Sequence, residues 1–103
     1  MPKNKKVFIL GMAKSGYEAA KLLSKDNKVL ITDMKEQNEQ HVEDLISRGV
    51  EYVITDKPEE LLDDSYDMMV KNPGILPTHK CVQKARELNI KIINEVELAY
   101  SYL

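Results

Sequence analysis

The chain has 103 residues, the length of one ordinary globular domain, which argues against a large catalytic cleft between two domains. Its 15 Lys and Arg residues stand against 17 Asp and Glu residues, and the net charge of −2 does not favour binding to nucleic acid through bulk electrostatics. Hydrophobic residues make up 43% and charged residues 31% of the chain, so a disordered or low-complexity protein is not indicated.

Two further features bear on the cellular compartment. No apolar run approaches the roughly 20 residues that cross a bilayer, and the apolar stretch after the basic N-terminus, Val7–Leu10, is too short for a signal peptide. The single cysteine, Cys81, excludes an internal disulfide and fits a reducing compartment. We therefore expect a cytoplasmic protein that binds neither membrane nor nucleic acid.

Short apolar runs alternate with amphipathic stretches from one end of the chain to the other. In chain order, the patterns predict a strand at Val7–Leu10, a helix from Ser15, a strand at Val29–Thr32, a helix at Glu39–Arg48 with Gly49 at its end, a strand at Tyr52–Ile54, a short helical stretch from Pro58 to Leu62, a strand at Tyr66–Val70, a helix at Thr78–Leu88, a strand at Ile90–Ile93 and a helix at Glu95–Leu103. Strands that alternate with helices are typical of parallel βαβ units. We expect an α/β fold, a single domain over residues 1–103 with a Rossmann-like, open, five-stranded parallel sheet and helices on both faces.

Ligands of such sheets bind at the carboxyl ends of the strands, and the loop after the first strand reads G-M-A-K-S-G. This is a near match to the dinucleotide fingerprint G-x-G-x-x-G, in which Gly11 suits the tight turn and Gly16 the close packing of the helix. Ala13 places a methyl group where a glycine usually lets the pyrophosphate come near. Ser15 can cap the helix or donate to a phosphate, and Lys14 can add a positive charge. We interpret the loop as an anion site; the alternative is a plain βα turn with a capping serine.

Three further strand ends have candidate residues. Asp33 ends the second strand, where an acidic residue meets a ribose or base in nucleotide-binding folds, and Lys35 follows it. We expect the Asp33 carboxylate at the rim of the sheet, so that its removal changes the folding free energy by no more than roughly 0.5 kcal/mol. The turn Asn72–Ile75 can press its backbone against a ligand. Asn94 and Glu97 are spaced as a helix capping box.

The sequence contains no catalytic residues that we can assign. His79 and Cys81 are spaced i, i+2, which does not bring side chains together on a helix, so no metal site is predicted. The motif G-x-x-x-x-G-K-[ST], which would cradle the phosphates of ATP, is absent from the chain. The acidic residues between Glu59 and Asp64 are interpreted as a solvated face.

Four segments together resemble one known family along the whole chain. They are VFILGMAKSG at Val7–Gly16, the pair Thr32-Asp33, VKNPGI at Val70–Ile75 and IINEVELA at Ile92–Ala99. The chain resembles the N-terminal domain of the Mur ligases, ATP-dependent enzymes of peptidoglycan synthesis. The resemblance implies a domain that binds the UDP part of UDP-N-acetylmuramoyl-L-alanine in a ligase that adds D-glutamate. The central domain, which binds ATP and magnesium, and the C-terminal domain would lie outside these residues, so the chain alone is expected to be inactive.

The resemblance also assigns the contacts with UDP to strand-end loops. They are Lys14 and Ser15 at the diphosphate and sugar, Asp33, Met34 and Lys35 at the uracil, and Gly74 near the uridine. The sequence departs from the family at two of these loops, because Ala13 stands where a glycine is frequent and Met34 where a hydroxyl residue is frequent. The alternative function is an NAD(P)-binding regulatory module of the same fold; Ala13 and the Asn72–Ile75 turn argue against it.

Overall fold

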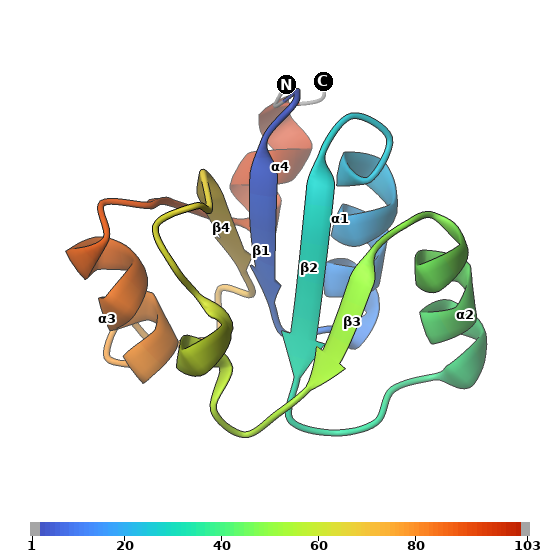
Figure 1. Ribbon diagram of the computed structural model, residues 1–103, viewed down its shortest axis with the longest axis horizontal. Helices are drawn as coiled ribbons and strands as arrows, with labels where there is room; N and C mark the ends of the chain where they lie inside the picture. Colours follow the sequence, from blue (N-terminus) through green and yellow to red (C-terminus); the bar gives the residue numbers. More distant parts are fainter. Residues whose placement is uncertain (1–2, 102–103) are drawn as a thin grey trace.

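The computed structural model of the chain describes residues 3–101 and contains one five-stranded sheet. Its strands are β1 (Lys6–Leu10), β2 (Lys28–Asp33), β3 (Glu51–Ile54), β4 (Met68–Lys71) and β5 (Lys91–Asn94). They lie in the spatial order β3-β2-β1-β4-β5, and all neighbouring strands are parallel (Figure 1). The predicted Rossmann-like fold is confirmed, with the chain crossing from one half of the sheet to the other between β3 and β4.

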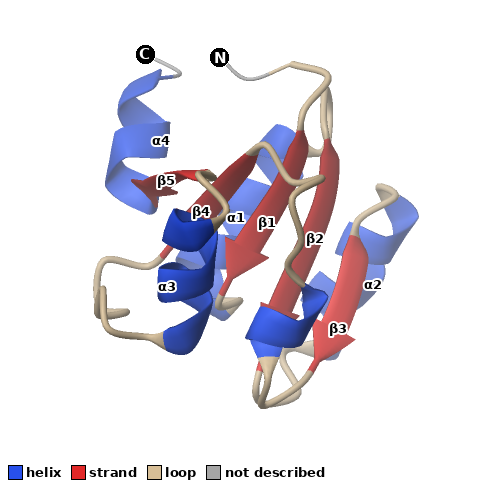
Figure 2. Cartoon of the chain, turned by 60° about the vertical axis from the view of Figure 1, so that its left-hand side comes forward, coloured by secondary structure: helices blue, strands red, loops and turns tan. Residues whose placement is uncertain are grey.

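Two layers of helices cover the sheet. The helices are α1 (Ala13–Leu23), α2 (Glu39–Ser47), the short 3₁₀ helix η1 (Pro58–Leu61), α3 (Lys80–Glu87) and α4 (Glu95–Ser101). Helices α1, α2 and α4 pack on one face, whereas η1 and α3 pack on the other (Figure 2). Because both faces are covered, the central strand β1 is buried at every position from Val7 to Leu10, which explains its unbroken apolar run.

Successive residues of β1 point into two separate cores. Val7 and Ile9 belong to the core beneath α1, α2 and α4, and Phe8 belongs to the core beneath η1 and α3. In the second core the Phe8 ring meets Tyr66 edge to face, with 5.3 Å between the ring centroids. Because all neighbouring strands are parallel, all five carboxyl ends lie at one edge of the sheet.

Most elements begin or end one or two residues away from their predicted positions, and the largest such shifts at a start include those of α1 and β4. Helix α1 begins at Ala13, earlier than the predicted start at Ser15. Strand β4 begins at Met68: Asp67 donates its backbone N–H to the Lys6 carbonyl at 2.8 Å, but it is the Asp67 carboxylate that accepts the N–H of Lys6, also at 2.8 Å. Both differences move an element boundary and leave the predicted order of elements intact.

The end of α2 confirms the prediction for Gly49. This residue has a φ of +82°, and its N–H donates to the Ile46 carbonyl at 3.0 Å, as expected of a glycine that ends a helix. The predicted end of the last helix, Leu103, lies outside the described residues. No helix among residues 3–101 has the length and apolar character to span a bilayer.

Candidate functional site

The loops at the carboxyl edge of the sheet lie next to one another because the strands that lead into them are neighbours. Leu10, the last residue of β1, pairs with Thr32 of β2 on one side and with Lys71 of β4 on the other. The N–H of Gly11 continues this pairing and donates to the Thr32 carbonyl at 2.9 Å. The glycine loop therefore lies between the segment after β2 and the turn after β4.

The two glycines of the loop have the roles that the fingerprint predicts. Gly11 has a φ of +95°, which allows the tight turn out of β1. A Cβ atom on Gly16 would lie 2.2 Å from the carbonyl oxygen of Gly11, so only a glycine lets α1 pack this closely on the turn. Ala13 has a φ of +25°, a region that a glycine enters more easily than an alanine.

Of the two roles considered for Ser15, capping of α1 is not found in the structure. The N-cap residue is Met12, which makes no side-chain capping bond, and Ser15 lies inside the first turn of the helix. Ser15 does not cap α1 because the helix begins before it. Ser15 and Lys14 instead line a groove beside α1.

Asp33 ties two of the loops together. Its Oδ2 accepts the backbone N–H of Met12 at 2.8 Å, and its Oδ1 accepts the N–H groups of Met34 at 2.6 Å and Lys35 at 3.3 Å. The side chain is half-buried, as expected at the rim of the sheet. The sequence did not reveal these bonds, and they make Asp33 a structural residue as well as a candidate ligand-binding residue. The carboxylate also lies at the start of α1, where the helix dipole favours a negative charge.

The segment after β2 is held by Asp33 at its start, by Tyr52 near its end and by the Asn38 cap where α2 follows. The N–H of Gln37 donates to Tyr52 Oη of β3 at 3.2 Å. Asn38 caps α2, since its Oδ1 accepts the N–H groups of Gln40 at 2.9 Å and His41 at 3.3 Å. Met34, near the start of the segment, is 63% exposed.

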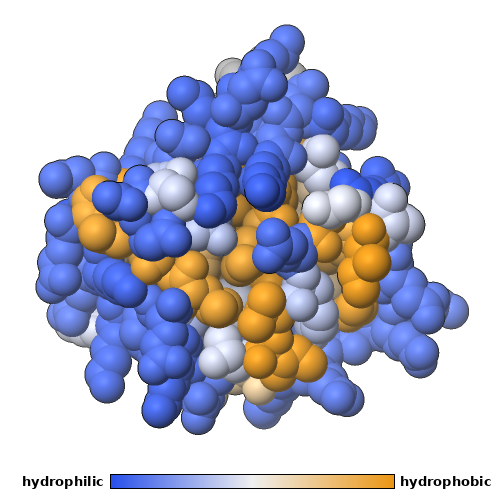
Figure 3. Space-filling view, in the orientation of Figure 1, coloured by the Kyte–Doolittle hydropathy of each residue, from blue (hydrophilic) through white to orange (hydrophobic). Residues whose placement is uncertain are grey.

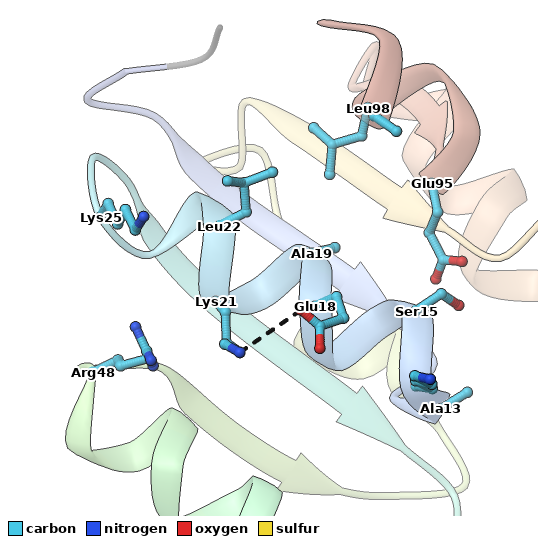
Figure 4. A pocket seen from close by; sticks show the side chains of 12 residues that line it. Ala13, Ser15, Glu18, Ala19, Lys21, Leu22, Lys25, Arg48, Glu95 and Leu98 are labelled. Carbon is cyan, nitrogen blue, oxygen red and sulfur yellow. Dashed lines mark ion pairs between the residues drawn. The ribbon is translucent and has the colours of Figure 1, made fainter. Parts of the chain in front are cut away.

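Two hollows flank the start of α1. A groove of about 850 Å³ runs between α1 and α4, where Leu22 and Leu98 face each other and Ser15 and Glu95 point toward one another at one end (Figure 4). Lys21 of this groove is paired with Glu18, with 3.7 Å between nitrogen and oxygen. A smaller hollow of about 310 Å³ lies between the starts of α1 and α2. It is lined by Met12, Ala13, Lys14, Tyr17, Glu18, Gln37, Asn38 and His41.

Two rings at the smaller hollow stack on each other, a contact that the sequence did not predict. The Tyr17 and His41 rings are stacked, with 3.9 Å between centroids and 4° between planes. Tyr17 also donates its hydroxyl to Asp44 Oδ2 at 2.6 Å, and Arg48 Nε donates to Asp44 Oδ1 at 3.1 Å. The bond from Tyr17 lowers the pKa of Asp44, and the same bond to the Asp44 carboxylate raises the pKa of Tyr17. The residues come from two helices, so no local pattern could have paired them.

The turn after β4 is fixed by its own side chains. Gly74 donates its N–H to Asn72 Oδ1 at 2.8 Å, and Lys71 donates its ammonium to the Ile75 carbonyl at 3.1 Å. Asn72 Nδ2 lies 3.5 Å from Glu95 Oε2, which links the turn to α4. Lys71 was not predicted to take part, although its place directly before the turn is visible in the sequence.

The surface near this edge is mixed in character. Figure 3 shows apolar surface across the middle of the face that carries α3, surrounded by hydrophilic side chains. Three exposed apolar residues belong to the carboxyl ends of strands or the segments that follow them: Met34 at 63%, Ile54 at 44% and Leu76 at 66%. Apolar side chains are thus available beside the polar groups of the loops.

The remaining predictions concern caps and metal ligands. The capping box is confirmed, because Glu97 donates its N–H to Asn94 Oδ1 at 2.8 Å and Asn94 donates its N–H to Glu97 Oε1 at 3.1 Å. His79 caps α3, its Nδ1 accepting the Cys81 N–H at 3.1 Å. Burial raises the pKa of the Cys81 thiol to about 12. Within residues 3–101 no group of three or more His, Cys, Asp or Glu side chains is placed to hold a metal ion.

Comparison with known proteins places these features in a family. A family model described as "Mur ligase MurD-like, N-terminal domain" matches residues 5–94. The UDP-N-acetylmuramoylalanine--D-glutamate ligase of Enterococcus hirae is 50% identical over 100 residues, and that of Lacticaseibacillus casei is 41% identical over 100 residues. Each alignment covers 95% of this chain but 22% of the relative, so the chain spans about a fifth of the length of these proteins.

Solved structures agree on the fold. The UDP-N-acetylmuramate:L-alanyl-gamma-D-glutamyl-meso-diaminopimelate ligase of Neisseria meningitides aligns with a TM-score of 0.71 at 15% identity, over 89% of this chain and 29% of that chain. The protein GenD2, solved in complex with NAD, aligns with a TM-score of 0.62 at 19% identity, over 91% of this chain and 27% of that chain. At these identities the likeness concerns the fold alone.

Proposed function

The chain belongs to the MurD-like N-terminal domain family of the Mur ligases, and we propose that it binds the UDP portion of UDP-N-acetylmuramoyl-L-alanine. The observation that carries the proposal is the Asp33 carboxylate, held by backbone N–H groups between the glycine loop and the segment after β2. The hollow of about 310 Å³ lies directly beside these two loops.

The bonding of Asp33 leaves it one acceptor position for a ligand. A carboxylate has about four lone-pair positions, and three of them accept the N–H groups of Met12, Met34 and Lys35. The remaining position, on Oδ2, suits the ring N–H of uracil. Met34 replaces the hydroxyl residue frequent in the family, and its exposed thioether side chain would cover an apolar face of the ring.

The diphosphate would lie along the start of α1. Backbone N–H groups of the first helical turn and the Lys14 ammonium favour an anion there, and the Ser15 hydroxyl can donate to phosphate or sugar. Lys35, in the segment after β2, would lie with Asp33 and Met34 on the uracil side of the site. Gly74, which is exposed in the turn after β4, allows its backbone to approach the uridine.

We further propose that the longer protein is a cytoplasmic ligase that adds D-glutamate in peptidoglycan synthesis, and through the cell wall serves cell shape and division. The curated relatives bear the name of this ligase, and the chain spans 22% of their length. ATP and magnesium do not fit the residues described here, which contain neither a phosphate loop of the ATPase type nor a metal-ligand cluster. They would be bound by domains outside these residues, and the chain alone would not release phosphate from ATP.

Chemical-shift mapping tests the choice of ligand. Titration of the chain with UDP is expected to give saturable shifts at Gly11–Gly16 and Asp33–Lys35, and NADH is expected to give weaker ones. Larger saturable shifts with NADH would instead favour the alternative function, an NAD(P)-binding module of the same fold.

A further inference from the structure

The segment Met34–Gln37 leads from Asp33 to the smaller hollow, which Gln37 lines, and has few bonds to the rest of the protein. Its first residues bond to Asp33, and the Gln37 side chain donates to the Lys35 carbonyl at 3.1 Å within the segment. Among the hydrogen bonds of residues 3–101, only the bond from Gln37 N–H to Tyr52 Oη joins this segment to another strand or helix. Between its two ends, which Asp33 and the Asn38 cap of α2 hold, the segment is therefore fixed by one hydroxyl group.

Tyr52 is well suited to hold the segment in place. It lies in β3 opposite Ile31 of β2, and its half-buried ring packs against the core beneath α1 and α2. The ring is thus anchored by packing, while the hydroxyl at its tip reaches the loop. Burial and the nearby carboxylates of Asp33 and Glu36 raise the pKa of Tyr52, so the hydroxyl stays neutral at physiological pH.

We propose that Tyr52 is a positioning residue for the uridine side of the site: by accepting the Gln37 N–H, it fixes the wall that Gln37 and Asn38 form at the smaller hollow. This inference rests on the proposed binding of UDP. It predicts that Tyr52 affects binding of the uridine and not of the diphosphate. Tyr52 acts on the segment after β2, whereas the diphosphate would lie at the start of α1.

The variant Tyr52→Phe tests the inference, since it keeps the ring and removes only the hydroxyl that accepts the Gln37 N–H. We expect the Gln37 amide proton to exchange at least about tenfold faster, because its hydrogen bond is lost. The Kd for UDP should rise by about 2- to 13-fold, the equivalent of the roughly 0.5–1.5 kcal/mol of one hydrogen bond. The Kd for inorganic diphosphate should stay close to that of the unmodified chain, and the melting temperature should fall only by the roughly 2–12 °C that the loss of one hydrogen bond implies for a domain of this size.

Tyr100→Phe is the matched control, because Tyr100 is 71% exposed on α4, away from this segment, and its variant should change none of these quantities. Unchanged Gln37 exchange, or an unchanged Kd for UDP in Tyr52→Phe, would overturn the inference. So would equal losses of UDP affinity and diphosphate affinity, which would indicate a merely structural role. If the unmodified chain failed to bind UDP at all, the proposed function would fall first and the inference with it.

Discussion

Asp33 Oδ2 accepts the backbone N–H of Met12 at 2.8 Å, so the last residue of β2 holds the N-cap residue of α1. The two residues belong to different loops of the carboxyl edge, and the bond fixes the distance between them. Any ligand that enters between the glycine loop and the segment after β2 therefore meets a site whose two sides are already joined.

This bond changes the prediction for Asp33→Ala. The sequence suggested a loss of no more than roughly 0.5 kcal/mol. The structure indicates a loss of about 1–3 kcal/mol, because three N–H groups lose their acceptor, and a smaller loss for Asp33→Asn, which keeps one carbonyl oxygen. Urea unfolding of the unmodified chain, Asp33→Ala and Asp33→Asn measures these losses in the free energy of unfolding.

Binding of UDP by the same variants separates the two roles of Asp33. Loss of a charge-assisted hydrogen bond, worth about 1.5–3 kcal/mol, corresponds to a Kd for UDP that is roughly 10- to 150-fold higher. An Asp33→Ala chain that unfolds early but binds UDP with unchanged affinity would leave Asp33 a purely structural residue.

Gly16→Ala should be strongly destabilising. The added Cβ would lie 2.2 Å from the Gly11 carbonyl oxygen, a backbone atom that moves only if α1 moves, and we expect a loss of at least about 2 kcal/mol. Gly49→Ala is the comparison: its φ is +82° but its Cβ would meet nothing within 4 Å, so backbone strain alone should cost about 1 kcal/mol. Equal losses in urea unfolding would show that the contact with Gly11 is relieved at little cost.

Thr32→Val should stabilise the chain. Within the described residues, Thr32 Oγ1 is buried without a hydrogen-bond partner, and burying a hydroxyl in this way is unfavourable. Replacing it by a methyl group of similar size is expected to raise the free energy of unfolding by about 1 kcal/mol. Thr55→Val is the control that should lose stability, because Thr55 Oγ1 accepts the Lys57 N–H at 3.0 Å. A loss of stability in Thr32→Val would indicate that its hydroxyl has a partner in solution.

The bond between Tyr17 and Asp44 should give stability a dependence on pH. The lowered pKa of Asp44 means that its contribution is present above its ordinary pKa of 3.8 and is lost as the pH falls through the lowered value. The raised pKa of Tyr17 means that its contribution is present below its ordinary pKa of 10.0 and is lost as the pH rises through the raised value.

Tyr17→Phe removes the bond and keeps the ring that stacks on His41. The difference in melting temperature between the unmodified chain and this variant should therefore be largest between these two limits and shrink at either extreme of pH. A difference that stays constant from acid to alkaline pH would show that the loss comes from packing and not from the hydrogen bond.

The sequence by itself determined the order and type of the elements and several of their ends. The unbroken apolar run at Val7–Leu10 predicted a strand covered on both faces, and Gly49, Asn94 and Glu97 marked helix ends as the structure has them. These features depend on residues within one turn of helix or one strand of each other, so their spacing along the chain is enough to predict them.

Only the tertiary structure decided which groups meet at the site. The bond between Met12 and Asp33 joins residues 21 positions apart, that between Gln37 and Tyr52 joins residues 15 apart, and that between Tyr17 and Asp44 joins residues 27 apart. Each depends on how the crossovers place a helix or a loop against a neighbouring helix or strand. The failed cap at Ser15 has the same origin, because close packing of Gly16 on Gly11 starts α1 at Ala13 and carries the serine into the first turn. The spacing of residues along the chain cannot predict such contacts, since they form only when the sheet has brought distant segments to one edge.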